Sequence, residues 1–560
     1  MLSVIIESFE AYLFAKNKYK DESNICWNST SPYILYKLNL LGENVKSLEK
    51  DLSINKQREI GDFAINFGNF FSNDLNKIFK NKFDLEIGSA LKHRIQVYMN
   101  TLIYKSYLLQ LWYKKNYRKK KLIIVGDERL KILEEFDLIH DRFDNLYFDI
   151  VLHSNIENIE LVRFKQSSGR KVLEKIERKT DVKVEERILY FLNNFSREHF
   201  SKIIDKYFQL KPTKNYKLLI LKQCSLIDES LKYFKKYDLS YFKDPNFLKK
   251  LKIERKKKSK RGSDLEYTIG HILSKLNWKL SLFDKGSFNI FTFSVINCLE
   301  FGVNLIDNCD ENFYIKTLAN SSISAVVTNG LTNPTEKLFQ QYNTKKGIDF
   351  FSFEHGLTAG LCSAITKSYF SQNLYTAGGD HLVCYNEQSF KHMNKFRKEK
   401  FGIVSGVPRK EIIIKFKLLQ RFIGRRFLGV NNNKRTIFFV AGLTRNNAFI
   451  PNLVSNDLDH FKVTNTIVFK VFSKVNDFCL LKLYPSIRYI DPEPWIEDTE
   501  LPSNVKVVQY FDFSLLRASA DVLITYSTQS TFAYILSAKK PIVFLDLFNL
   551  DDLLSDSEMP

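Results

Sequence analysis

Three features that often identify a protein class are missing from these 560 residues. The seven cysteines are scattered and form no CxxC pair, which argues against a zinc site or a disulfide framework and favours a reducing compartment. No run of about 18 apolar residues occurs, so a membrane-spanning helix is not expected. The chain has no Walker loop and no GxGxxG motif, which removes the P-loop and dinucleotide-binding classes, and no cofactor is expected. No metal is expected either, because no second His or Cys stands at ligand spacing from Asp380-His381 or from 307–310.

The first residues also lack the pattern of a signal peptide. Glu7 and Glu10 stand where a signal peptide would be apolar, and no basic segment precedes them. We therefore expect a cytoplasmic protein that is at most peripheral to the inner face of a cell membrane.

What the chain does have is an excess of basic residues. Lysine and arginine number 84 against 63 acidic residues, which gives a formal net charge of +21. Two clusters stand out, at 114–121 and 249–261. Such clusters suit a polyanionic partner, such as an anionic membrane surface, but they are equally typical of solvated helix faces, and both interpretations stay open.

The first third of the chain alternates between helical and strand patterns. Ser31-Pro32 predicts a helix start, helical periodicity runs through 57–116, and 121–128 reads as a strand, with 146–154 as a further candidate strand. We expect residues 1–154 to form an α/β region with a parallel sheet. Residues 155–300 are mostly helical and charged in pattern, with a weak strand signal at 216–221, and are expected to form a helical insertion.

Alternation resumes in 301–430, which is expected to complete the N-terminal Rossmann-like domain. Residues 322–356 predict a β-α-β unit whose second strand ends at Glu354, His355 and Gly356. The polar tract 431–434 predicts a linker.

A second Rossmann-like domain is expected in 435–560. Five short apolar strands and one helix alternate there, a pattern typical of a doubly wound sheet. The strands are predicted at 435–443, 478–485, 505–511, 520–527 and 541–546, and the helix at 531–538. Only 14 residues follow the last strand, so this domain is expected to be shortened.

Several turns that follow predicted strands carry groups suited to a phosphorylated substrate. They supply a carboxylate and an imidazole in EHG, basic side chains in SGVPR and KLYPSIR, and hydroxyls in the turn TYSTQST that opens a helix. Ligands bind beyond the carboxyl ends of strands in open parallel sheets, and the free N–H groups of a helix start bind phosphate.

The order of these motifs resembles that of the bacterial GT-B enzymes of capsule and cell-wall polymer synthesis. The shared pattern is a β-α-β unit ending in [E/Q]HG, then SGxPR, then Kx[H/Y]P, then a Ser/Thr-rich turn with a helix and KP[IV]VF, over about 320–546. That family includes the CDP-glycerol glycerophosphotransferases and capsular polysaccharide transferases that use CMP-activated acidic sugars. The resemblance implies two Rossmann-type, doubly wound domains facing across a cleft, here with a helical insertion in the N-terminal half.

The resemblance also implies roles for particular residues. Glu354 or His355 would act as general base on the acceptor hydroxyl, and Gly356 would let the backbone pass close to the acceptor. The residues that would contact the donor nucleotide are Gly406, Arg409, Lys482, Tyr484, Arg488, Ser527, Thr528, Gln529, Ser530 and Thr531.

The sequence departs from the family pattern at two places. Tyr484 stands where a histidine is usual, and tyrosine is a poor acid near neutrality. Phe532 and Ala533 occupy the region in which an acidic residue often holds a ribose.

The sequence thus predicts a transferase that moves a sugar, or a polyol phosphate, from a CMP-, CDP- or UDP-linked donor to a polysaccharide or lipid-linked acceptor at the cell surface. Two alternatives stay open. One is a sugar-nucleotide epimerase on the same scaffold, and the other is a polyanion- or nucleic-acid-binding protein that uses the basic clusters. The strand-end turns argue against nucleic acid, because a nucleic-acid binder does not need them.

Overall fold

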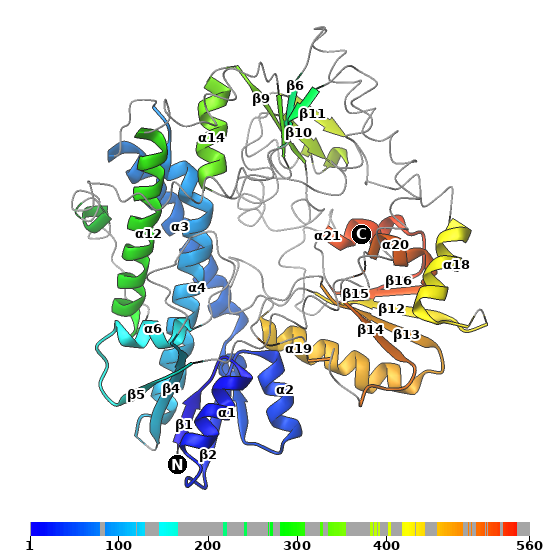
Figure 1. The fold of residues 1–560 in the computed structure, drawn as a ribbon, viewed down its shortest axis with the longest axis horizontal. Helices are drawn as coiled ribbons and strands as arrows, with labels where there is room; N and C mark the ends of the chain where they lie inside the picture. The colour runs from blue at the N-terminus through cyan, green and yellow to red at the C-terminus, as the bar shows by residue number, and fades with distance from the viewer. Residues whose placement is uncertain are drawn as a thin grey trace.

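The computed structural model shows a mixed α/β protein (Figure 1). The residues that the structure describes are 2–78, 84–118, 120–128, 145–165, 217–220, 240–242, 267, 269–272, 281–307, 325–328, 334–345, 347–353, 381–384, 386–388, 390–391, 401–404, 417–431, 433–442, 456–484, 491, 494–495, 500–509, 511, 513–526 and 530–545. Within them the strands form three sheets, and every strand pair in these sheets is parallel.

The N-terminal sheet has the strand order β3-β2-β1-β4-β5, with a chain reversal between β1 and β4. Helices follow most of its strands, because each parallel neighbour needs a crossover. Its elements are β1 (Leu2–Ile5), α1 (Phe9–Lys18), β2 (Ile25–Ser29), α2 (Pro32–Leu40), β3 (Val45–Ser47), η1 (Leu48–Asp51), α3 (Ile54–Ile78), α4 (Ile87–Asn116), β4 (Lys121–Asp127), α6 (Leu146–Leu152) and β5 (Ile159–Phe164).

The middle sheet has the order β11-β10-β9-β8-β6-β7. Its elements are β6 (Lys217–Ile220), β7 (Ser240–Phe242), α12 (Asp284–Asp307), β8 (Ala325–Thr328), α14 (Pro334–Lys345), β9 (Asp349–Phe353), β10 (His381–Cys384) and β11 (Phe401–Val404). The predicted β-α-β unit is confirmed, because β8 and β9 pair in parallel on either side of α14.

The C-terminal sheet has the order β14-β13-β12-β15-β16, which repeats the order of the N-terminal sheet. All five strands and the helix predicted for this region are confirmed. Its elements are α18 (Lys417–Leu428), β12 (Thr436–Val440), α19 (Asp457–Thr466), η4 (Ile467–Val471), η5 (Phe472–Lys474), β13 (Phe478–Lys482), β14 (Val505–Val508), α20 (Phe513–Leu516), η6 (Arg517–Ser519), β15 (Val522–Thr525), α21 (Ser530–Ser537) and β16 (Ile542–Phe544).

Two sequence expectations differ from these sheets. The candidate strand at 146–154 is wrong, because residues 146–152 form α6; a short apolar run fits a buried helix as well as a strand. The expected helical insertion 155–300 contributes β5 to the N-terminal sheet and β6 and β7 to the middle sheet. Within the described residues, the strands of 301–430 therefore form one sheet with β6 and β7, through the pairing of β8 with β6, and do not join the N-terminal sheet.

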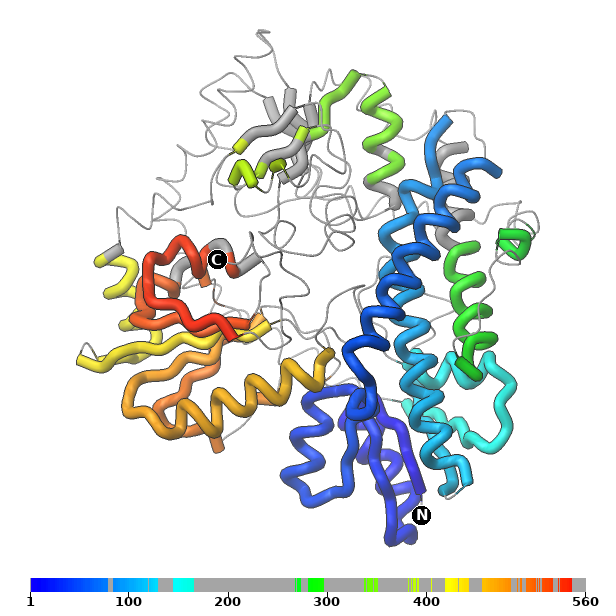
Figure 2. The backbone as a smooth tube through the Cα atoms, turned by 180° about the vertical axis from the view of Figure 1, so that it is seen from behind, coloured from blue at the N-terminus to red at the C-terminus, as the bar shows by residue number. Residues whose placement is uncertain are grey.

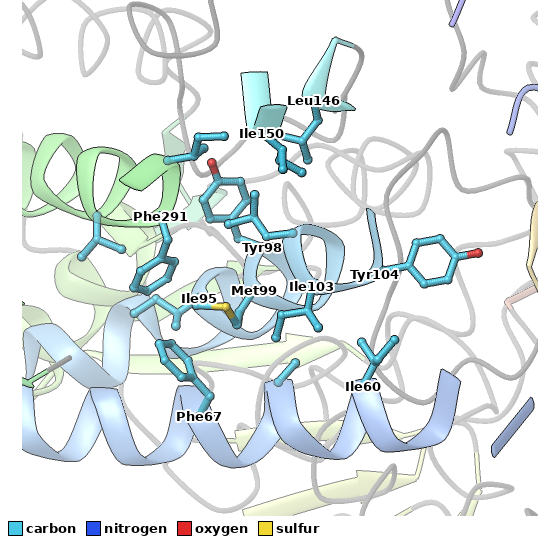
Figure 3. Close-up of a cluster of buried hydrophobic side chains, with 14 of the residues drawn as sticks. Ile60, Phe67, Ile95, Tyr98, Met99, Ile103, Tyr104, Leu146, Ile150 and Phe291 are labelled. Carbon is cyan, nitrogen blue, oxygen red and sulfur yellow. The ribbon is translucent and has the colours of Figure 1, made fainter. Parts of the chain in front are cut away.

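The largest core lies around α4. This 30-residue helix packs against α3, α6, α12 and α14, and apolar side chains from these helices meet around it (Figure 3). Phe67 and Phe71 of α3 stack on each other, and both meet Phe291 of α12 edge to face. None of the helices in the described ranges has the length and apolarity that a membrane-spanning segment requires.

Replacing Gly88 with alanine is expected to destabilise the α3–α4 pair by about 1–3 kcal/mol. A Cβ atom there would lie 2.0 Å from the main-chain oxygen of Ser72, so the helices would have to move apart. Gly270 is the control, because it is helical and has open space around it; alanine there should stabilise by up to about 1 kcal/mol. Hydrogen exchange of the α3 and α4 amides would be measured in both variants. Equal protection of these amides in the two variants would contradict the close contact between α3 and α4 at Gly88.

Candidate functional site

Most of the residues predicted for the site lie outside the described residues. These are Glu354, His355, Gly356, Gly406, Arg409, Arg488, Ser527, Thr528 and Gln529. The strands that precede them in the sequence are described, and they belong to two different sheets. EHG follows the carboxyl end of β9 and SGVPR follows β11, both in the middle sheet, whereas the hydroxyl turn follows β15 in the C-terminal sheet.

Lys482 is the last residue of β13 and is almost completely buried. Its ammonium group donates hydrogen bonds to the main-chain oxygen of Leu483, at 2.7 Å, and to that of Gln509. These bonds tie the segment after β13 to the segment after β14. Tyr484 follows two residues later and is half-buried.

Ser530 and Thr531 open α21, which follows β15. In the C-terminal sheet β15 is the neighbour of β12, and these two strands mark the point at which the strand order reverses. Ligands of open α/β sheets bind at this point, beyond the carboxyl ends of the strands. The topology therefore places Ser530 and Thr531, at the start of α21, near the preferred binding position of their sheet.

A histidine–tyrosine pair lies at the same position. The Nδ1 atom of His460, in α19, is 2.9 Å from the hydroxyl of Tyr526, which follows β15, and both side chains are buried. Gly442, after β12, packs against them so closely that a Cβ atom would lie 2.7 Å from each ring. The first turn of α19 is thus fixed against the ends of β12 and β15.

The carboxyl edge of the N-terminal sheet holds a buried ion pair. Glu7 follows β1, and its carboxylate lies 2.9 Å from the ammonium group of Lys105 on α4. The lysine side chain is 1% exposed and that of the glutamate 8%, and the ammonium group also lies 4.4 Å from the ring centre of Tyr147. Each of these two buried charges depends on the other, because water cannot reach either ion to take the place of its partner.

Asp149 on α6 belongs to the same edge. Burial, and next the negative charge of Glu7, raise the pKa of Asp149 to about 7. Lys105 and Arg163 act in the opposite direction. The N-terminal sheet thus places a carboxyl group that titrates near neutrality beside a buried ion pair.

Glu49 joins the N-terminal sheet to the C-terminal sheet. It lies in η1, after β3, and its carboxylate accepts hydrogen bonds from the Tyr104 hydroxyl at 2.6 Å and from the main-chain N–H of Leu458 at 3.0 Å. Leu458 is in the first turn of α19, where N–H groups are free to bind a carboxylate. Burial, and next the negative charge of Asp457, raise the pKa of Glu49 to about 8.

Two further contacts join the same edges. The main-chain N–H of Phe9, at the start of α1, donates to Asp491 at 2.9 Å, and Asp491 lies beyond β13. The ring of Tyr36 on α2 meets the ring of Phe461 on α19 edge to face. Both views of the chain show α19 beside the N-terminal strands and helices (Figure 1, Figure 2). Segments that follow β1, β2 and β3 therefore contact segments that follow β12 and β13.

Sequence reasoning missed most of these groups. Glu7 had a signal, since it follows the first apolar run of the chain by one residue. Glu49, Lys105, Asp149 and His460 had none, because each lies on a helix or helical turn at a position that would suit an ordinary surface residue. Across the described ranges we find no group of three or more His, Cys, Asp or Glu side chains arranged to hold a metal ion.

Comparison with known proteins adds little to this geometry. No protein-family model matches the chain, and no curated protein matches it. A search of solved structures finds the glycosyltransferase SnogD from Streptomyces nogalater at 11% sequence identity, covering 60% of this chain and 84% of that one, with a TM-score of 0.27.

Proposed function

We propose that the protein is a glycosyltransferase built on two Rossmann-type sheets. The observation that carries the proposal is the contact between the carboxyl edges of the N-terminal and C-terminal sheets, made by Glu49 with Leu458, Phe9 with Asp491 and Tyr36 with Phe461. Parallel sheets bind ligands at these edges. Two of them in contact suit a reaction in which one sheet binds a nucleotide donor and the other side supplies the acceptor.

The donor is proposed to bind at the C-terminal sheet, between the ends of β12 and β15. The hydroxyl turn 527–531 and the start of α21 would bind the phosphate, since the N–H groups of a helix start attract anions. Arg409, Lys482 and Arg488 would stabilise the charge of the leaving nucleotide. Lys482 would act on it indirectly, because its ammonium group is bonded to the main chain of the neighbouring segments.

The general base is proposed to be Glu354 or His355, which follow β9 in the sequence, so the proposal adds a residue of the middle sheet to the acceptor side that the N-terminal sheet supplies. A base that removes a proton from the acceptor hydroxyl works best with a pKa near the working pH. The donor is proposed to be CMP-, CDP- or UDP-linked, and the acceptor a polysaccharide or a lipid-linked precursor of one, because the order of the motifs resembles that of transferases with such substrates.

The proposal predicts that a pyrimidine nucleotide raises the melting temperature of the purified protein by a few degrees at saturating concentration. CMP, CDP and UDP would be compared with GDP. The double variant Ser527→Ala, Ser530→Ala is expected to lose the stabilisation. The matched control is Ser473→Ala with Ser503→Ala, two exposed serines of the same region, and it should keep the stabilisation. If no nucleotide shifts the melting temperature of the wild-type protein, the donor site is refuted.

The base is tested separately. His355→Ala and Glu354→Gln should each retain the nucleotide-induced shift, and the variant of the true base should release nucleotide from the sugar donor at least a hundredfold more slowly. Wild-type release in both variants would show that the base lies elsewhere.

A further inference from the structure

The first half of helix α18 exposes apolar residues, although Leu428 at its end is buried in the core of the C-terminal sheet. Leu418 is 83% exposed and Phe422 is 54% exposed, and they lie one turn apart on the same side, with Leu419 beside them. Arg426, one turn further on, is also exposed on that side. A surface helix of a globular protein normally has the opposite arrangement, with apolar residues inward and charged residues outward.

The inward side of α18 explains why the helix cannot rotate to bury these residues. Arg421 is bound to Asp521 at 2.8 Å, and the buried Arg425 is 3.6 Å from the same carboxylate. Arg425 also donates to the main-chain oxygen of Asn431 at 2.8 Å. These bonds link the helix to the residue that precedes β15, so turning the apolar side inward would break a partly buried charge network.

The charge around the exposed side is strongly one-sided. Residues 417–435 contain six lysines and arginines and no acidic residue. Lys434 is exposed, as is Arg426, and Arg435 is partly neutralised by Asp477 at 3.2 Å. Two copies of this surface would repel each other. A nucleic acid would neutralise the charge but would leave Leu418 in water, because phosphates and sugars offer little apolar area.

We propose that α18 is the element by which this protein lies on an anionic lipid bilayer. Leu418, Leu419 and Phe422 enter the boundary between headgroups and acyl chains, while Arg426 and Lys434 pair with lipid phosphates, as in interfacial amphipathic helices. In both views α18 lies at the outer margin of the chain, away from the N-terminal sheet (Figure 1, Figure 2). This surface goes beyond the proposed transferase activity and does not depend on it.

The test is flotation of the full-length protein with vesicles of phosphatidylcholine alone or with about a third phosphatidylglycerol. The wild-type protein should float with the anionic vesicles only, and less as salt is raised. Leu418→Ser with Phe422→Ser should weaken binding to them at least about tenfold, because two apolar side chains no longer leave water. Arg426→Gln with Lys434→Gln should weaken it several-fold and reduce the dependence on salt.

The matched control is Leu40→Ser with Leu41→Ser, which removes two apolar side chains that are 51% and 57% exposed near the end of α2. This control should bind vesicles like the wild type, and both serine variants should keep the wild-type melting temperature. Unchanged flotation of the Leu418/Phe422 variant would overturn the proposal. Sedimentation gives a second test. A dimeric wild type and a monomeric Leu418/Phe422 variant would also overturn the proposal, because α18 would then contact a second copy of the chain.

Discussion

Replacing Lys105 with methionine is expected to destabilise the N-terminal sheet by about 3–5 kcal/mol, because the Glu7 carboxylate would be left buried without its partner. The pair lies 2.9 Å apart with both side chains almost fully buried, and methionine keeps most of the volume of the lysine. The loss should appear as faster hydrogen exchange of the β1 and β4 amides, which report on this sheet without requiring the whole chain to unfold in one step.

The same helix supplies the control. Lys115 on α4 also pairs at 2.9 Å, with Asp51, but both side chains are more than half exposed. Lys115→Met should therefore cost well under about 1 kcal/mol. Adding Glu7→Gln to Lys105→Met should recover part of the loss, since residue 7 would no longer be a buried, unpaired charge. If Lys105→Met and Lys115→Met destabilised the sheet equally, the burial of the Glu7–Lys105 pair would not contribute to its stability.

Replacing Glu49 with glutamine is expected to stabilise the protein at about pH 8 and to remove part of its dependence on pH. The pKa of Glu49 is about 8 in the native protein, whereas that of an ordinary glutamate is 4.5. Between these values the unfolded chain has lost the proton while the native protein still binds it. Native stability therefore falls as the pH rises through this window, by up to about 5 kcal/mol at about 1.4 kcal/mol per pKa unit. Glutamine cannot lose a proton and escapes this loss.

The measurement is urea unfolding of the wild type and of Glu49→Gln at several pH values from about pH 5 to about pH 9. The difference between the two should grow in favour of the variant as the pH rises, and then level off. Glu160→Gln provides a control of opposite sign, because the salt bridge with Lys121 lowers the pKa of Glu160 and stabilises the native protein above that pKa. A constant difference between Glu49→Gln and the wild type would mean that Glu49 is ionised throughout this range.

The pH dependence has a structural consequence for the contact between the sheets. Glu49 faces Tyr104 of α4 and, from α19, the Leu458 N–H, Asp457 and Asp459. With Glu49 protonated, the two aspartates face a neutral group. Loss of the proton puts a negative charge on Glu49 beside these aspartates, and the Leu458 N–H, the Tyr104 hydroxyl and, at Asp459, the charge of Lys462 oppose the repulsion.

The candidate site was only partly predictable from the sequence. The strand-end turns could be found because short apolar runs bounded by polar turns are local patterns, and β8, β9, β12, β13 and β15 all appear where these patterns indicate them. The hydroxyl turn could also be assigned to a strand end, although not to the point at which strand order reverses. That position depends on the pairing of β12 with β15, which are separated by more than 80 residues.

The Glu49 contact could not be predicted at all. Glu49 and Leu458 are separated by 409 positions, and neither belongs to a motif. In the sequence Glu49 is one of several charged residues in a polar stretch, and its burial is produced by α4 and α19, which cover it from two sides. A glutamate in such a stretch is ordinarily interpreted as an exposed residue of a surface turn.

By itself the sequence determined the alternation of strands and helices, the parallel C-terminal sheet and the β8-α14-β9 unit, because apolar periodicity and turn residues act over a few neighbours. Only the tertiary structure decided that 146–152 is a helix, that β6 and β7 join the strands of 301–430, and that the two outer sheets meet at their carboxyl edges. It also decided that α18 exposes Leu418, Leu419 and Phe422. These outcomes depend on which distant segments cover a residue, and a local pattern does not contain that information.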